Sequence, residues 1–125
     1  MKNIIALFIL GFSLNSLADC MENSNYPTVS KTDLQKIAEN KSAFIIDVNS
    51  DDSYKKSHVP GAVHFDAIEK TFATSLPADK NAEIITYCGS TMCSAWQKAA
   101  RKACKLGYKN IKHFKEGIAG WNKNS

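Results

Sequence analysis

Two cysteines in the stretch IITYCGSTMCSAW, residues 84–96, could do chemistry. Cys88 ends an apolar run and enters a loop of small and polar residues, and Cys93 completes a Cys-x4-Cys pattern before a helix-like segment. Free backbone N–H groups and the helix dipole stabilise an anion at such a strand-to-helix junction, and they lower the pKa of a thiol placed there. We therefore predict that the Cys88 thiolate is a catalytic nucleophile.

The composition of the loop limits which kinds of anion Cys88 could carry. Arginine is absent between Cys88 and Trp96, whereas phosphoryl and arsenyl chemistry on cysteine usually relies on a guanidinium to clamp three oxygens. Backbone N–H groups and hydroxyls suit a smaller anion, such as a persulfide. The predicted substrate-binding residues are those of the loop that follows Cys88: Gly89, Ser90, Thr91, Met92 and Ser94.

The other cysteines leave alternatives open. Cys93 is either a resolving thiol that attacks a Cys88 adduct or a residue that packs at the start of a helix. Cys104 is interpreted as a small, core-facing residue, and Cys20 as free, bridged to Cys104 or lipidated. Four cysteines allow three full pairings, among which sequence alone does not choose. A Cys-x4-Cys spacing without a second paired motif does not favour zinc, so no metal or cofactor is expected.

The N-terminus, MKNIIALFILGFSLNSLADC, has the layout of a secretory signal peptide. One lysine precedes an apolar stretch that is too short to span a bilayer, and Ser16-Leu17-Ala18 forms a small-x-small cleavage site. We expect residues 1–18 to be removed, residues 19–27 to form a flexible arm, and residues 28–125 to form one domain. Export to the periplasm is the expected localisation, with lipid anchoring through Cys20 as the alternative. A formal charge of +4, from scattered residues, indicates at most a mild attraction for small anions and no nucleic-acid partner.

The pattern along the chain alternates strands and helices. The runs 43–48 and 83–87 are almost continuously apolar, as expected for strands buried on both faces. Weaker signals predict an extended piece at 28–30, a helix ending near residue 40, a helical turn at 51–57, a strand at 62–65, helices at 66–76 and 94–106, a strand at 110–114 and a last helical turn at 117–121. Such alternation predicts an α/β fold with a mainly parallel sheet and helices on both faces, in which ligands bind beyond the carboxyl ends of the strands.

Four segments, taken together, resemble the rhodanese-like sulfurtransferase family. They are FIIDV (44–48), SHVPGAVHF (57–65), ITYC (85–88) and LGYKNIKHFKEGIAGW (106–121), and they occur in the family's order over most of the chain. The resemblance implies that Cys88 carries a persulfide, taken from thiosulfate or a persulfide donor and passed to a thiol acceptor. The expected partners are therefore a small sulfur-containing anion or persulfide donor and a thiol acceptor, small molecule or protein, with the protein itself a monomer.

The chain departs from the family's pattern at several positions. Asn49 stands where an arginine is usual, Ser57 replaces the glycine before the signature histidine, and Glu116 replaces the first glycine of the terminal pair. The loop after Cys88 is also longer than in common single-domain members. Two other functions stay open: thiol–disulfide exchange by Cys88 and Cys93, which the paired cysteines and the expected export favour, and sulfur binding without turnover.

Several polar and aromatic residues are predicted to be structural rather than catalytic. Asp47 ends a buried strand and is interpreted as a turn acceptor, and His58 as a lock on the turn of the family signature. His64 and His113 lie in strand-like segments. Trp96 and Trp121 are assigned to the core.

Overall fold

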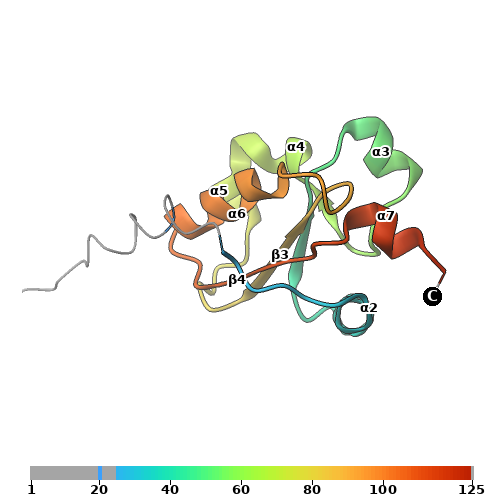
Figure 1. Cartoon of the computed structure of the whole chain (residues 1–125). Helices are drawn as coiled ribbons and strands as arrows, with labels where there is room; N and C mark the ends of the chain where they lie inside the picture. The colour runs from blue at the N-terminus through green and yellow to red at the C-terminus, as the bar shows by residue number, and fades with distance from the viewer. Residues whose placement is uncertain (1–19, 21–24, 125) are drawn as a thin grey trace, which may run out of the picture.

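The computed structural model describes residues 20 and 25–124, which fold around one parallel sheet (Figure 1). Its four strands are β1 (Phe44–Asp47), β2 (Val63–His64), β3 (Glu83–Tyr87) and β4 (Asn110–His113). They are arranged in the order β2-β1-β3-β4, and every neighbouring pair is parallel. The predicted α/β fold with a mainly parallel sheet is confirmed.

The two most apolar runs form the two central strands. In β1 and β3 successive side chains point to opposite faces, so Ile46 and Ile84 join one buried cluster while Ile45 and Ile85 join the other. Both faces are apolar because both are covered by helices, as is usual for parallel sheets.

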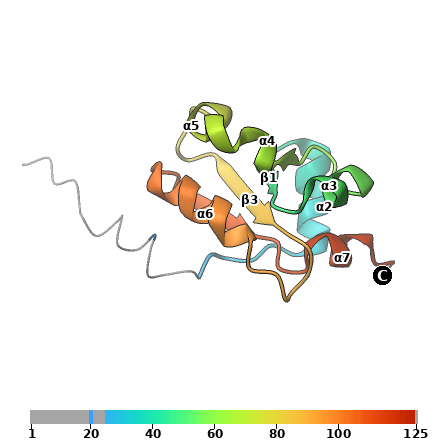
Figure 2. The ribbon, with the colours of Figure 1, turned by 90° about the horizontal axis from the view of Figure 1, so that it is seen from above.

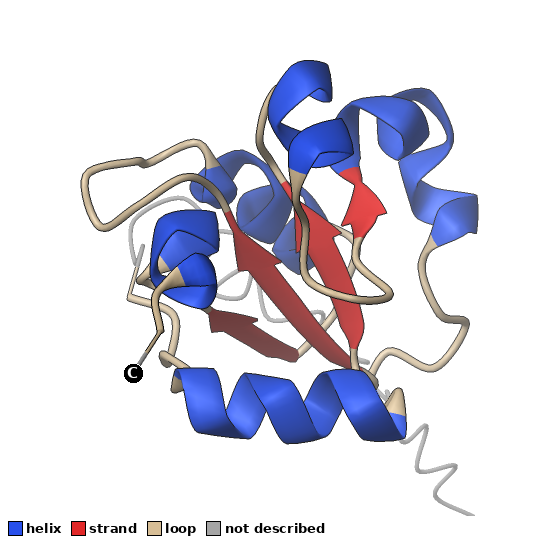
Figure 3. Ribbon diagram, turned by 90° about the vertical axis from the view of Figure 1, so that its right-hand side faces the viewer, coloured by secondary structure: helices blue, strands red, loops and turns tan. Residues whose placement is uncertain are grey.

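Helices cover both faces of the sheet (Figure 3). One face carries α4 (Phe65–Ile68), η1 (Glu69–Thr71), α5 (Phe72–Ser75) and α6 (Trp96–Lys105). The other face carries α2 (Lys31–Asn40) and α7 (Gly117–Asn122), while α3 (Asp51–Lys56) follows β1. The Ser30 side chain caps α2 by accepting a hydrogen bond from the Asp33 N–H.

The helix predicted at 66–76 is wrong in its continuity, because three short pieces replace it. The carbonyl oxygen of Thr71 accepts hydrogen bonds from the hydroxyls of Thr74 and Ser75. Side-chain hydroxyls of this kind compete with the backbone ladder and break the helix locally. The strand predicted at 62–65 is likewise shorter, because Phe65 already begins α4 and packs into the core.

The N-terminal part of the described chain runs along β4. Val29 donates its N–H to the His113 carbonyl, and His113 donates to the Pro27 carbonyl, so the predicted extended piece borders the sheet. The predicted signal peptide and most of the predicted arm lie outside the described residues. Across residues 20 and 25–124, no helix is long and apolar enough to cross a membrane.

Cys20 is joined to Cys104 of α6 by a disulfide, with 5.7 Å between the two Cα atoms. This pairing was one of the three alternatives for Cys20. It corrects the interpretation of Cys104 as only a core-facing residue: its sulfur is half-buried against the core and also links α6 to the N-terminal segment. Hydrophobic periodicity places a cysteine on a helix face but does not show whether it has a disulfide partner.

Candidate functional site

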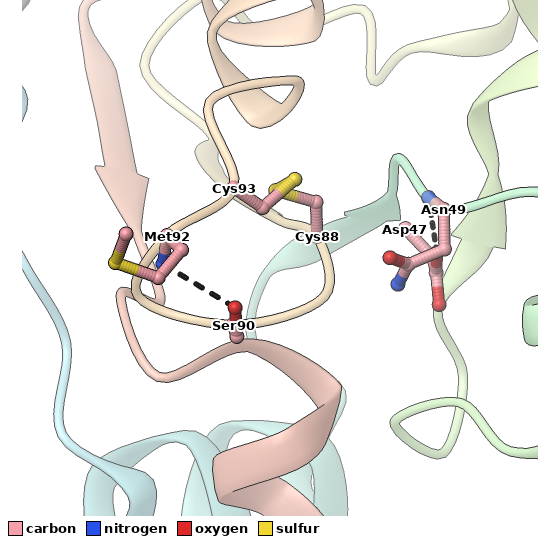
Figure 4. Close-up of a disulfide and its surroundings, with 6 residues drawn as sticks. All are labelled: Asp47, Asn49, Cys88, Ser90, Met92 and Cys93. Atoms are coloured by element: carbon pink, nitrogen blue, oxygen red, sulfur yellow. Dashed lines mark hydrogen bonds between the residues drawn. A yellow bond between two sulfur atoms is a disulfide. The ribbon is translucent and has the colours of Figure 1, made fainter.

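Cys88 follows β3 directly, at the carboxyl end of the sheet, and the loop that it starts leads into α6 (Figure 2). Its sulfur is bonded to that of Cys93 (Figure 4), and the two Cα atoms lie 6.2 Å apart. That separation is within the ordinary range for a disulfide, so the loop closes as far as a resolving thiol requires. Cys88 is only 2% exposed, whereas Cys93 is half-buried.

A tight turn brings the two cysteines together. The Cys93 N–H donates to the Ser90 carbonyl at 3.1 Å, and the Met92 N–H donates to the Ser90 hydroxyl at 3.3 Å. These bonds close a turn with Thr91 and Met92 at its tip. Helix α6 begins only at Trp96, later than the predicted start at residue 94, so the chain around Cys93 is free to turn inward.

The loop residues predicted to bind substrate are placed differently from one another. Gly89 and Ser90 lie directly after Cys88, while Thr91, Met92 and Ser94 are exposed. The Met92 side chain is 91% exposed and points away from the disulfide (Figure 4). Gly89 and Ser90 thus adjoin Cys88, whereas the Met92 side chain extends into solvent.

The start of α7 orients the loop through two backbone hydrogen bonds. Ile118 donates its N–H to the Cys88 carbonyl and Ala119 donates to the Gly89 carbonyl, each at 2.9 Å. In a trans peptide the C=O and N–H of one unit point in opposite directions. The N–H groups of Gly89 and Ser90 therefore point away from α7, and within the described chain neither has an acceptor. These two donors are available to an anion.

Gly117 allows α7 to approach the loop this closely. Its φ is +64°, and a Cβ placed there would lie 2.6 Å from the Cys88 carbonyl oxygen and 2.7 Å from the Ser90 nitrogen. Only glycine fits both the conformation and the contact. Gly117 lies in the segment that resembles the family's ending, and its role was not predicted from the sequence, although a glycine at the start of a helix is a signal for it.

Asn49 is a second residue whose role was not predicted from the sequence, where it stands only as a departure from the family pattern. Its carboxamide points toward the Cys88 loop (Figure 4), with Oδ1 at 3.5 Å from the position that a Cβ on Gly89 would occupy. The backbone of Asn49 is held by the Asp47 carboxylate and by the His64 ring. Its Nδ2 is buried and has no hydrogen-bond partner in the described protein. A buried unpaired donor is costly, so this nitrogen is suited to meet an acceptor on a ligand.

Asp47 has the predicted role of a turn acceptor. It accepts a hydrogen bond from the Asn49 N–H at 2.8 Å and another from the Tyr87 hydroxyl at 2.6 Å. The same hydroxyl accepts from the Val59 N–H. Burial, together with the bond to Asp47, raises the pKa of Tyr87 well above its usual value. The phenol therefore remains protonated and ties β1, β3 and the turn at residue 59 together.

The histidines and tryptophans also lie in structural settings. His58 bonds through Nδ1 to the Tyr54 carbonyl and stacks on the Tyr54 ring, which fits the predicted lock on a turn. His64 and His113 are buried in or beside strands, and Trp96 is buried in the core. Trp121 is partly buried against the second cluster.

A basic hollow of about 640 Å³ begins where the loop ends. Its lining runs along the outer side of α6 and includes Ser94, Lys98, Arg101, Lys102 and Lys105. Lys98 is paired with Glu69 at 3.0 Å, which neutralises part of this charge. Among the described residues, no group of three or more His, Cys, Asp or Glu side chains could hold a metal ion.

The comparisons with known proteins agree with this arrangement. The sequence pattern that defines the Rhodanese-like domain matches residues 30–124, which is most of the chain. The chain belongs to the rhodanese-like domain family. The human single-domain sulfurtransferase TSTD1 has the same fold, with a TM-score of 0.64 and 21% identity over 81% of this chain and 100% of that one.

Two relatives carry names that bear on function. The thiosulfate sulfurtransferase GlpE of Coxiella burnetii is 26% identical over 96 residues, which cover 77% of this chain and 87% of GlpE. YrkF of Bacillus subtilis, named as a candidate sulfur carrier protein, is 35% identical over 89 residues. That match covers 70% of this chain but only 45% of YrkF, so this rhodanese-like chain spans less than half of that relative.

Proposed function

We propose that this protein is a sulfurtransferase in which Cys88 carries sulfane sulfur as a persulfide. The Cys88 thiolate attacks the outer sulfur of thiosulfate, a Cys88–sulfur bond forms, and sulfite leaves with the electron pair of the broken S–S bond. A persulfide donor would react in the same way and lose a thiolate. A thiol acceptor then takes the terminal sulfur and regenerates the Cys88 thiolate, so one transfer is divided into two steps.

The observation that carries this proposal is the position of Cys88 in its loop. Cys88 stands where strand β3 ends, and α7 turns the Gly89 and Ser90 N–H groups outward without internal acceptors. Such backbone donors can hydrogen-bond a persulfide anion, and they do so without adding a formal charge to the site. The Asn49 Nδ2, which is buried and unpaired, adds a neutral donor for an oxygen of the incoming anion. The names of GlpE and YrkF point to the same chemistry.

The test is thiocyanate formation from thiosulfate and cyanide by the protein after its disulfides have been reduced. Wild type should form thiocyanate, and Cys88→Ser should form none above the uncatalysed rate. Cys104→Ser is the control, since it also removes one disulfide-forming cysteine but lies outside the loop. Equal rates for Cys88→Ser and wild type would contradict the proposal.

The disulfide between Cys88 and Cys93 supports a second candidate, a thiol–disulfide exchange protein. Exchange requires an attacking thiolate and a second thiol that resolves the mixed disulfide, and these two residues meet both needs. Equilibration in glutathione buffers distinguishes the two functions. A reversible Cys88–Cys93 couple in a protein that accepts no sulfane sulfur would favour the second candidate.

For localisation, we propose export after cleavage behind Ala18, with donor and acceptor met in an oxidising compartment. The two disulfides of the described chain are consistent with such a compartment. N-terminal sequencing of the protein from a producing cell should begin at Asp19. A chain that retains Met1 in the cytoplasm would refute this assignment.

A further inference from the structure

Cys93 is close enough to act on whatever Cys88 carries. The two sulfurs form a disulfide across a turn that places their Cα atoms 6.2 Å apart. The hydrogen bonds that close this turn involve Ser90, Met92 and the Cys93 backbone, and none of them depends on a cysteine side chain. The reduced loop can therefore keep the Cys93 thiol next to the Cys88 sulfur.

We propose that Cys93 discharges the Cys88 persulfide as hydrogen sulfide, which makes the protein a sulfane-sulfur reductase. This inference rests on the proposed function, because it requires the Cys88 persulfide. The Cys93 thiolate attacks the inner sulfur, Cys88 Sγ, and the Cys88–Cys93 disulfide forms while the bond to the terminal sulfur breaks. Hydrosulfide leaves with that bond's electron pair and takes up a proton. The sulfane sulfur is reduced by two electrons, and the two thiols are oxidised to the disulfide.

The structure favours attack on the inner sulfur rather than on the terminal one. Cys93 Sγ is bonded to Cys88 Sγ itself, so the loop can adopt the geometry that this step produces. Attack on the terminal sulfur would only move the persulfide to Cys93 and would release no sulfide. Hydrosulfide is also a competent leaving group for attack on the inner sulfur, because it is a weaker base than an ordinary alkyl thiolate and a sulfur with a lower pKa leaves faster.

A dithiol reductant is needed to reduce the Cys88–Cys93 disulfide before the next turnover. The difference in burial between the two cysteines decides which sulfur the reductant attacks. Cys88 is 2% exposed in the disulfide state, whereas Cys93 is half-buried beside the fully exposed tip of the loop at Met92. The reductant's thiolate therefore attacks the Cys93 sulfur, and the Cys88 thiolate is the leaving group. The second thiol of the reductant then breaks the mixed disulfide. The reductant ends as a disulfide, and both cysteines return as thiols.

The experiment is a single turnover without added thiol and without oxygen. Reduced protein, freed of reductant, receives one equivalent of thiosulfate; released sulfide is then quantified, and the intact mass is measured after denaturation. Wild type should release close to one sulfide per sulfur accepted and should lose the mass of two hydrogens. Cys93→Ser should keep one added sulfur and release no sulfide. The rate at which the Cys88 persulfide, once formed, releases sulfide should not depend on protein concentration, because this attack is intramolecular.

The outcomes separate this inference from the proposed function. Wild type that keeps its added sulfur and both thiols would overturn the inference and leave the sulfurtransferase intact. Sulfide release by Cys93→Ser equal to that of wild type would also overturn it. If neither protein accepts sulfur, the persulfide itself is wrong and the inference falls with it. A variant with Cys20→Ser and Cys104→Ser is the matched control, since it retains only the loop pair and should release sulfide as wild type does.

Discussion

His113 stacks face to face on Trp96, the first residue of α6. The ring centroids are 3.5 Å apart and the planes differ by 12°, while Tyr26 packs edge-on against the same indole. Burial, with a smaller contribution from the positive charge of Lys115, lowers the pKa of His113 to about 4. The imidazole is therefore neutral at physiological pH and acts as a flat packing surface beneath the start of the helix that follows the Cys88 loop.

This stacking predicts a pH dependence of stability. In the unfolded chain His113 binds a proton near pH 6.5, whereas in the folded chain it does so only near pH 4. The free energy of unfolding should therefore be constant above about pH 6.5 and should fall towards pH 4, by at most about 3 kcal/mol from this residue. His113→Phe keeps a stacking ring and should remove that part of the slope in urea titrations. An unchanged slope would show that His113 is not the group that titrates.

The Tyr87 hydroxyl is the residue-scale link between the two central strands. Tyr87→Phe removes its bonds to the Asp47 carboxylate and the Val59 N–H, and both partners are buried. We expect the free energy of unfolding to drop by about 2–4 kcal/mol, because the buried Asp47 Oδ2 and Val59 N–H both lose their hydrogen-bond partner. Tyr54→Phe, which removes a single bond to the Ala62 carbonyl, is the control and should cost about 1 kcal/mol. Equal losses would mean that Asp47 finds another partner.

At the scale of elements, the start of α7 fixes the conformation of the loop that begins at Cys88. Gly117→Ala forces a Cβ into the Cys88 and Gly89 peptides at a φ of +64°, and we expect a loss of about 3 kcal/mol in stability. Sulfur transfer should also fall, by roughly a hundredfold, because the loop donors shift. Gly61→Ala is the matched control: its φ is +81°, but nothing lies within 4 Å, so only the backbone cost of about 1 kcal/mol applies. Similar activity losses in both variants would contradict the role of α7.

The elements that could be predicted from the sequence are those with strong local signals. The apolar runs predicted β1 and β3, because burial on both faces leaves a direct mark on composition. The contact between Gly117 and the Cys88 peptides could not be predicted, since it joins segments far apart in the chain. The break at Thr71 depends on hydroxyl rotamers, and the Cys20 pairing depends on tertiary position, neither of which periodicity reports.

At the scale of the whole molecule, the two disulfides close loops of very different length, so we expect them to contribute differently to stability. Cys20–Cys104 spans 84 residues, whereas Cys88–Cys93 spans 5. In the chain-entropy description the first contributes about 4.5 kcal/mol and the second about 2 kcal/mol. Cys104→Ser should therefore lower the midpoint of urea unfolding clearly more than Cys93→Ser, without changing sulfur transfer. A larger effect from Cys93→Ser would show that the short disulfide is the main structural one.

The parallel sheet brings the parts of the candidate site together at one edge. The loop after β3, Asn49 after β1 and the start of α7 after β4 meet beyond the carboxyl ends of the strands, where ligands of such folds bind. The Cys88 sulfur lies among them. The whole architecture is therefore interpreted as a frame that presents one sulfur atom to a donor and then to an acceptor.

Locating the transferred sulfur is the most direct test of this account. Reduced Cys93→Ser, treated with thiosulfate, alkylated without reduction and digested, should carry its added sulfur on the peptide that contains Cys88. Cys93→Ser with Cys88→Ser should carry none. An added sulfur on Cys20 or Cys104, or no added sulfur on any peptide, would contradict the central claim that Cys88 is the sulfur carrier.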